Sequence, residues 1–342
     1  MTEYLKIRGL QLFADDPLNT NVTSDPGLSV ENKTFYDRAL IEEASPELIH
    51  GQFGQKRPIP KNGGKRIEFR KYASLPKALT PLTEGVTPEG KKLSASSIEA
   101  EVSQYGDYVS LSDILDLTAI DNNVLEATKA IGRQAGLTLD TITRNVLQSG
   151  TNVFYCPKVG AGGATTAVTS RSGLDKTCVL TVDVVKKVAT MLKAANAPKI
   201  AGDYVCIVHP YVAYDIMSDP HWEEAHKYAT PENIYQGEIG KIAGVRFVET
   251  SEAAVYTGDG CPAGLAVFGC LFLADGAYGV TEVTGGGLQT IIKQRGSGGT
   301  SDPLDQRSTV GWKAMQTAEI LMEPYMVRVE CCSAFSATAE AN

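Results

Sequence analysis

The sequence has no long apolar run. Its longest strongly apolar stretch, Gly264 to Ala274, has the length of a buried strand, and no run reaches the roughly 18 residues that a membrane-spanning helix needs. The first residues, Met1 to Ala14, are too short and too interrupted to contain the apolar region of a signal peptide. We therefore expect no membrane association and no export by a signal peptide.

Regular cysteine spacing is also missing. The number of cysteines is odd, their spacings are irregular, and no C-x-x-C pair occurs. This pattern argues against a disulfide framework and against a zinc or redox motif. We expect reduced thiols in a reducing compartment, filling small buried apolar positions. The cysteines are Cys156, Cys178, Cys206, Cys261, Cys270, Cys331 and Cys332.

Signatures of catalysis and cofactor binding are scarce. His221 and His226 are five residues apart, which separates their imidazoles around a helix and does not match H-E-x-x-H. The glycine-rich segment 237–244 has no Ser or Thr after its lysine, as a phosphate-binding loop requires. His50 and His209 stand beside no recognisable nucleophile motif. We predict no catalytic residue, no metal site and no cofactor.

Charge is distributed unevenly along the chain. Residues 56–92, which we call the basic limb, contain ten lysines and arginines and three glutamates, so the limb carries +7 and the rest of the chain −15. A cationic limb on an acidic body favours attraction between copies of one protein; a solvated basic loop is the alternative. The net charge of −8 does not suggest nucleic-acid binding over the whole surface. With only Phe69 and Tyr72 to stack on bases, the limb is also poorly suited to bind single strands.

Alternation of polar and apolar residues predicts strands within and after the limb. Period-two patterns cover residues 66–70, 98–102 and 105–111. We predict a long antiparallel ribbon with a turn-rich tip. A two-stranded ribbon alone is marginally stable in water, so it needs a partner surface in its own chain or in another copy. The residues that interrupt the patterns are Pro76, Pro81, Gly85, Pro88 and Gly90.

The remaining pattern indicates a mixed α+β chain. An extended arm is expected over residues 1–28, followed by a helix over 30–44. A long helix is expected over 122–148, because apolar and small residues recur every three or four positions at Thr128, Ile131, Ala135, Leu139, Ile142 and Val146. Before it, Asp113, Asp116 and Asp121 offer carboxylates to a cation, but such residues more often cap a helix.

The second half of the chain alternates predicted helices and strands. A loop or short hairpin is expected over 151–177, and helices over 182–196 and 211–217. Glycine clusters at 258–264, 285–287 and 296–302 predict turns and loops. Strands are expected at 204–208, 245–250, 265–273, 278–283, 288–293 and 324–329.

Several segments of the sequence are informative when they are taken together. The first are QFGQKRP at 52–58, PKNGGKRIEFRKY at 60–72, PLTEGVTPEG at 81–90 and QYGDYVSLSDILDLTAID at 104–121. The later ones are HPYVAYDIMSDPHWEEAHKYATPENIYQGEIGKIAGVRFVET at 209–250, LAVFG at 265–269 and DQRSTVGWKAMQTAEILMEPYMVRVE at 305–330. Together these segments resemble the major capsid proteins of tailed bacteriophages, in the podovirus and prophage-type subfamily of the Hong Kong 97-type capsid fold. The resemblance covers nearly the whole chain.

The resemblance implies an α+β capsid fold with named parts. These would be an N-terminal arm at 1–28, an N-terminal helix region at 29–50 and an extended hairpin called the E-loop at 51–112. A peripheral domain with a long spine helix would comprise 113–150 and 300–342, and an axial domain would comprise 151–299. The basic limb would lie within the E-loop, laid over a neighbouring subunit.

The resemblance also implies a function. The chain would be a structural, non-enzymatic subunit of the virion capsid. It would self-assemble in the bacterial host cytoplasm into hexamers and pentamers of an icosahedral head around double-stranded DNA, without sequence-specific binding. Expected partners are other copies, a portal, a separate scaffolding protein and decoration proteins. The alternatives are an encapsulin-like compartment shell and an α/β hydrolase or nucleotide-binding enzyme built on the region after Lys176.

Residues of the limb are the predicted contacts between subunits. Their cations should face acidic surface on a neighbour, and Glu84 and Gly85 should lie near the tip. The predicted contact residues are Lys61, Lys65, Arg66, Arg70, Lys71, Lys77, Glu84, Gly85, Lys91 and Lys92.

Overall fold

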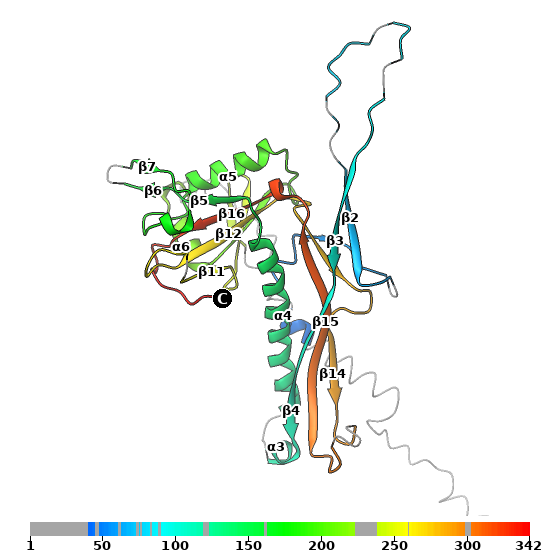
Figure 1. Ribbon diagram of the computed structural model, residues 1–342. Helices are drawn as coiled ribbons and strands as arrows, with labels where there is room; N and C mark the ends of the chain where they lie inside the picture. The colour runs from blue at the N-terminus through cyan, green and yellow to red at the C-terminus, as the bar shows by residue number, and fades with distance from the viewer. Residues whose placement is uncertain are drawn as a thin grey trace, which may run out of the picture.

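The computed structural model contains two β-sheets, a long helix and a projecting hairpin (Figure 1). Among the residues that it describes, one sheet has five strands and the other has seven. The predicted arm at 1–28 and most of the predicted helix at 30–44 lie outside the described residues; residues 40–44 are helical. The described residues are 40–44, 48–60, 63–72, 75, 77–82, 84–87, 90–118, 123–160, 163–222, 238–258, 260–297 and 302–342.

The long helix α4 (Asn123–Gln148) lies along the five-stranded sheet. The central strand β15 (Arg307–Ile320) pairs with β4 (Ser103–Ser112) at every position of β4. On its other edge β15 pairs with β13 (Tyr278–Glu282) and β14 (Gln289–Lys293). The short strand β1 (Gln55–Lys56) extends this sheet beyond β13. The core between helix and sheet contains Leu40, Ile131, Ala135, Leu139, Val310, Trp312 and Ala314.

The predicted apolar stripe of α4 is correct over its first part and wrong near its end. Thr128, Ile131, Ala135 and Leu139 are buried, as predicted, but Ile142 and Val146 are only partly buried. The buried positions there are Thr143, Arg144, Leu147 and Gln148. Leu147 packs in a different core, with Val205, Leu271 and Met326, because the last turns of α4 face the second sheet.

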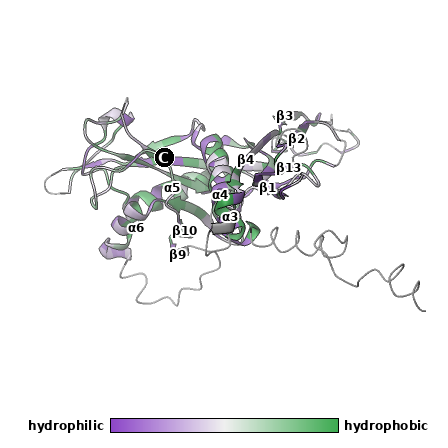
Figure 2. Cartoon of the chain, turned by 90° about the horizontal axis from the view of Figure 1, so that it is seen from below, coloured by the Kyte–Doolittle hydropathy of each residue, from purple (hydrophilic) through white to green (hydrophobic). Residues whose placement is uncertain are grey.

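The seven-stranded sheet forms the second body of the fold. Strands β8 (Tyr204–Val208) and β12 (Val267–Leu273) are buried at every position, as expected for strands covered on both faces. Helices α5 (Val182–Ala194) and α6 (Pro210–Met217) contribute buried side chains to its core. Figure 2 shows hydrophobic residues gathered in the strands near β10 and on these helices. The other strands are β5 (Val153–Tyr155), β16 (Met326–Cys331), β10 (Val245–Glu249), β9 (Glu238–Ile242) and β11 (Val255–Tyr256).

Smaller elements complete the described chain. Strands β6 (Lys158–Val159) and β7 (Thr165–Thr166) form a short hairpin within the segment predicted as a loop or short hairpin. Helix α3 (Asp113–Thr118) follows β4 at the far end of the five-stranded sheet (Figure 1). Short 3₁₀ helices occur at η2 (Arg171–Gly173) and η4 (Glu323–Tyr325). None of the described helices is long and apolar enough to cross a membrane.

Strand pairing does not follow the predicted boundaries of the peripheral and axial domains. Strands β13 and β14 lie inside the predicted axial segment 151–299, yet they pair with β15. Conversely, β16 lies inside the predicted peripheral segment 300–342, yet it pairs with β12. The chain therefore crosses between the two sheets more often than the two predicted boundaries, at 150/151 and 299/300, allow. The strand predicted at 324–329 begins at Met326, because residues 323–325 form η4.

Candidate functional site

The projecting hairpin consists of β2 (Arg66–Tyr72) and β3 (Ala95–Glu101), which pair antiparallel from Arg66 opposite Glu101 to Tyr72 opposite Ala95. This confirms a ribbon over residues 66–101, whereas β1 and β4, which lie inside the hairpin predicted at 51–112, pair in the five-stranded sheet. It extends away from both sheets and from α3 (Figure 1). Figure 2 shows that its strands are largely hydrophilic. The element thus has little apolar surface with which to stabilise itself.

One face of the hairpin base rests on β13. The Phe69 ring is 3% exposed, and a Cβ atom added at Gly279 would lie 2.7 Å from that ring. A side chain at Gly279 would therefore displace Phe69. The guanidinium of Arg57 lies 5.7 Å from the centre of the same ring. The base is thus anchored by one aromatic side chain seated over a glycine, while the rest of the ribbon projects.

A buried polar cluster fixes the segment that leads into the hairpin. The Nδ1 atom of His50 lies 2.6 Å from Oδ2 of Asp140, and the His50 backbone N–H donates to Oδ1 of Asp140 at 2.7 Å. Both side chains are fully buried. The Tyr278 hydroxyl donates to the His50 carbonyl, and burial raises the pKa of that hydroxyl. Three elements, the loop at His50, α4 and β13, therefore meet at one buried cluster, in which His50 has a structural role.

A second network joins the end of α4 to the seven-stranded sheet. Arg171 donates two hydrogen bonds of 2.7 Å to the buried carboxylate of Glu330, which holds the pKa of that guanidinium above its usual value. Arg328 lies 3.1 Å from the same carboxylate and donates to the carbonyl of Gln148, the last residue of α4. The Gln148 side chain in turn donates to Gly269 of β12 at 3.1 Å. These contacts set the orientation of α4 relative to the sheet.

Some predicted contact residues are paired within their own hairpin. Arg66 lies 3.7 Å from Glu99 and 3.5 Å from Glu101, and Arg70 lies 3.5 Å from Glu68. All of these side chains are substantially exposed, so each pair contributes little to stability. The pairs nevertheless reduce the positive charge that the base of the hairpin presents to a neighbour.

The remaining predicted contact residues lie directly before β2, between β2 and β3, or outside the described chain. Lys65, Lys77, Lys91 and Lys92 are exposed. Glu84 and Gly85 form a turn midway between the two strands, as predicted, and Gly85 has a φ of 76°, which favours glycine. Lys61 lies outside the described residues, and the side chain of Lys71 does as well.

Large apolar side chains of the tip are functional candidates that the sequence reasoning missed. They are 55–82% exposed, and the described parts of the tip place no core against them. Leucines occur there among prolines, glycines and lysines, without the polar–apolar alternation of a strand. This pattern could have indicated apolar side chains that no core of the same chain covers. These residues, which we call the apolar tip residues, are Leu75, Leu79, Leu82, Val86 and Leu93.

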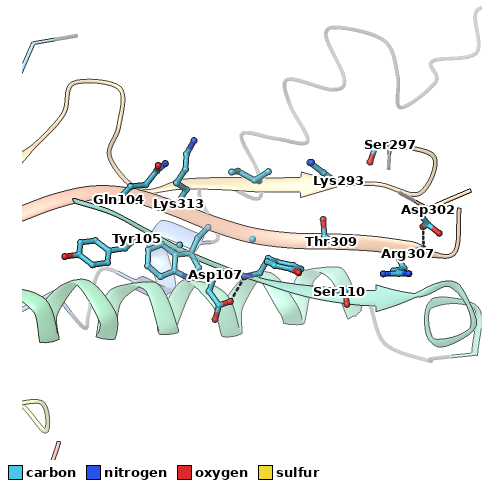
Figure 3. Close-up of a pocket in the computed structure, with 15 residues that line it drawn as sticks. Gln104, Tyr105, Asp107, Ser110, Lys293, Ser297, Asp302, Arg307, Thr309 and Lys313 are labelled. Carbon is cyan, nitrogen blue, oxygen red and sulfur yellow. Dashed lines mark hydrogen bonds between the residues drawn. The ribbon is translucent and has the colours of Figure 1, made fainter. Parts of the chain in front are cut away.

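A groove of about 720 Å³ runs along β4, β14 and β15 (Figure 3). Lys293, Lys313 and Thr309 point away from α4, whereas Asp107 points toward it. The Asp107 carboxylate accepts from Gln134 of α4 at 2.7 Å, and this bond lowers the pKa of the carboxyl. The lining also contains the carboxylate of Asp302, which accepts from the Arg307 backbone N–H at 2.8 Å, and the three cations Lys293, Arg307 and Lys313. No histidine or cysteine is among the residues that line the groove.

The histidines considered for chemistry have structural contacts. His209 caps α6 by accepting from the Tyr211 backbone N–H at 3.2 Å, and its ring lies 4.9 Å from that of Phe268. Burial lowers its pKa to about 4. The His221 backbone N–H donates to Asp219, and His226 lies outside the described residues. No group of three His, Cys, Asp or Glu residues in the described chain is placed to hold a metal ion.

The segments considered for phosphate or cation binding have simpler roles. In the glycine-rich segment 237–244, Ala243 and Gly244 both have positive φ and join β9 to β10 in a tight turn. Asp113 accepts from the Ile114 backbone N–H at the start of α3, while Asp121 lies outside the described residues. Six of the seven cysteines are buried and all seven are unpaired, as predicted.

Comparisons with known proteins agree with this architecture. A family model described as phage capsid protein matches residues 95–324. The capsid of Ralstonia phage GP4 has a TM-score of 0.64 at 15% identity, covering 85% of this chain and 90% of that chain. The capsid of the cyanophage P-SCSP1u has a TM-score of 0.61 at 14% identity, covering 82% and 87%. A virus-like particle from Pyrococcus furiosus has a TM-score of 0.50 at 8% identity, covering 87% and 99%.

No curated protein matches the sequence significantly. The structural likenesses confirm the predicted α+β fold of the Hong Kong 97 type. The family match extends from β3 through α4 and the long strand β15, which is more than half of the chain. The chain therefore belongs to the phage capsid protein family, as a structural subunit of a phage head.

Proposed function

We propose that this chain is the major capsid protein of its phage, assembled into hexameric and pentameric capsomers of an icosahedral shell around double-stranded DNA. The observation that carries the proposal is the projecting hairpin, whose tip exposes large apolar side chains that the described residues of its own chain do not cover. Such a surface is typical of a protein interaction site. In a shell, a neighbouring copy would cover it.

The proposed contact lies between the hairpin of one copy and the body of the next. The acidic charge outside the basic limb supports this arrangement, because opposite charges favour the encounter of two copies. Since Arg66 and Arg70 have carboxylates within their own hairpin, we assign the intersubunit charge contacts mainly to the tip lysines Lys77 and Lys92. Among the described residues, neither of these lysines has an ion-pair partner.

The proposal also names the partners of the chain and its location in the cell. Copies of the chain would assemble in the host cytoplasm with a portal and a separate scaffolding protein, and decoration proteins would add to the shell. The chain would have no catalytic role, no cofactor and no membrane association. DNA would be enclosed without sequence-specific contacts, which the acidic charge of the body supports.

Electron microscopy of the purified chain beside size-exclusion chromatography tests the proposal. Rings or closed shells are expected under assembly conditions. A small monodisperse species under every condition, together with turnover of a substrate, would contradict it and favour the enzyme alternative. A genome neighbourhood with terminase and portal genes is expected, whereas a neighbouring cargo enzyme would favour the encapsulin-like shell.

A charge variant tests the role of the tip. Lys77→Glu with Lys92→Glu should leave the fold unchanged, since both side chains are exposed, and should slow shell formation at low salt. Raised salt should relieve the new repulsion by screening it. The matched control, Lys77→Arg with Lys92→Arg, retains the charge and should assemble normally. Equal assembly of both variants at low salt would exclude an electrostatic role for these lysines.

A further inference from the structure

Residues 333–342, which we call the strap, cross the seven-stranded sheet near β11 (Figure 1). The Asp215 carboxylate of α6 accepts from the Ala334 backbone N–H at 3.1 and 3.2 Å. Further along, the Ala337 carbonyl accepts from the Ala266 backbone N–H at 2.8 Å. The strap is therefore tied to the sheet at separate points along its length.

The second half of the strap has few other means of attachment. Residues 337–342 belong to no helix or strand, and they contain three alanines and no large apolar side chain. A groove of about 640 Å³ lies between these residues and the segment before β11, and His209 and Tyr211 line it. Because the strap spans this groove and does not fill it, its position depends on individual hydrogen bonds.

The Asn342 side chain supplies three of these hydrogen bonds. Its Oδ1 atom accepts from the Val255 backbone N–H at 3.0 Å. Its Nδ2 atom donates to the carbonyls of Ser251 at 3.1 Å and Ala253 at 3.0 Å. A primary carboxamide has two N–H donors and one carbonyl acceptor, so each of its functions is used. The side chain thus pairs with the edge of β11 as the peptide group of an added strand would.

The same loop also contacts the last turns of α4. Arg144, which is 2% exposed, donates to the Glu252 carbonyl at 2.9 Å and lies 3.9 Å from the Glu252 carboxylate. The Tyr256 hydroxyl donates to Oε1 of Gln148 at 2.8 Å. Residues 251–256 are therefore held both by the strap and by α4.

We propose that residues 251–255 form a binding site for a primary carboxamide on an extended peptide, that Asn342 occupies this site, and that its occupation braces the last turns of α4. The site selects a carboxamide because a carboxylate of the same shape has no N–H to donate to the two carbonyls. The inference goes beyond the proposed function and does not depend on it, because every residue involved belongs to one chain.

Hydrogen exchange of the unassembled full chain, measured by mass spectrometry, tests the site. Asn342→Asp retains the size of the side chain but removes both donors and places an anion beside two carbonyls. Exchange of residues 251–256 should become at least about fivefold faster, and exchange of residues 144–148 should also rise. Exchange in β15 should stay unchanged, which shows that the variant is folded.

The matched control is Glu340→Gln, which changes an exposed carboxylate two residues earlier in the strap and should leave all of these exchange rates unchanged. Unchanged exchange of residues 251–256 in Asn342→Asp would overturn the carboxamide site. A rise that is confined to residues 251–256 would overturn the bracing of α4.

A double-mutant cycle tests whether the loop transmits the effect to α4. Tyr256→Phe removes only the hydroxyl that donates to Gln148. If the loop couples the strap to α4, Asn342→Asp should accelerate exchange of residues 144–148 less in the Tyr256→Phe background than in the wild type. Equal acceleration in the two backgrounds would overturn the coupling through Tyr256.

Discussion

The His50 side chain joins the entry to the hairpin to α4 through one buried carboxylate. Removal of that carboxylate by Asp140→Ala would leave the His50 ring and the His50 backbone N–H without their acceptor in a fully buried place. Because breaking a buried pair leaves an unsatisfied partner, we expect the free energy of unfolding to fall by about 3 kcal/mol or more. Chemical denaturation of unassembled protein measures this change.

An exposed pair supplies the control for this prediction. Arg66 and its partner Glu99 are 69% and 65% exposed, so Arg66→Ala should lower the free energy of unfolding by less than about 1 kcal/mol. A similar small loss for Asp140→Ala would show that the cluster does not stabilise the fold. The contrast between the two sites depends on burial, which no local sequence pattern around His50 indicates.

His209 gives the fold a pH dependence whose sign follows from its burial. Its pKa is lowered from an ordinary value of 6.5 to about 4, so below pH 6.5 the unfolded chain binds a proton that the folded chain does not. The contribution of neutral His209 is complete above pH 6.5 and is lost as the pH falls toward 4. A difference of this size corresponds to about 3 kcal/mol.

The variant His209→Asn isolates this contribution. Asparagine retains an oxygen that can cap α6 but does not titrate, so the stability of the variant should fall less between pH 7 and pH 4.5 than that of the wild type. The slope of stability against pH is compared, since lost ring contacts with Tyr211 and Phe268 will lower the absolute value. Equal slopes for the two proteins would contradict the assignment of this pH dependence to His209. Asp175, whose pKa is lowered to about 2 by hydrogen bonds from Thr177, contributes the same pH dependence to the stability of both proteins.

At the scale of the element, the hairpin depends on a single aromatic anchor. Phe69 is buried over Gly279 but belongs to none of the three hydrophobic cores. Phe69→Ala should therefore loosen the hairpin while the two sheets stay folded. We expect faster hydrogen exchange in β2 and β3 and little change in α4 or β12. Gly279→Ala should act in the same direction, because the added methyl group meets the Phe69 ring.

A substitution on the exposed face of the hairpin serves as the control. Ser97 is exposed on β3, and Ser97→Ala should leave the exchange of the hairpin unchanged. Unfolding of the whole chain by Phe69→Ala would show that the anchor belongs to the general core. Unchanged exchange would show that the strand pairing alone holds the ribbon.

Elements with a strong local period could be predicted from the sequence. The long helix was predicted at 122–148 and lies at Asn123–Gln148, and the buried strand predicted at 204–208 is β8. The hairpin was also predictable, because alternation on both sides of a turn-rich segment specifies its pairing. These features depend on residues that are close together in the sequence.

Features that depend on distant contacts could not be predicted. The face of α4 changes near Thr143 because its last turns meet the second sheet, and only the tertiary fold places that sheet there. For the same reason the sequence does not show that β16 joins β12 rather than the sheet of β15. The pairing of Arg66 with Glu99 and Glu101 follows from the hairpin register, which the charge count of the limb does not include.

For the whole molecule, the exposed tip suggests that assembly and folding depend on different residues. The apolar tip residues are outside the hydrophobic cores and are 55–82% exposed in the single chain. Their burial between copies would remove apolar surface from water at about 25 cal/mol per Å². The association of copies should therefore depend on these side chains, whereas the stability of one chain should not.

Replacement of the five apolar tip residues by serine tests this separation. Because their side chains are exposed, the free energy of unfolding should change by less than about 0.5 kcal/mol for each substitution. Shell formation should be strongly reduced, since the contact between copies would lose its apolar surface. Circular dichroism during denaturation and electron microscopy of the same preparation measure the two properties. A variant with methionine at Leu79 and Leu82 retains apolar surface and should form shells. Normal shells from the serine variant would show that another surface drives assembly.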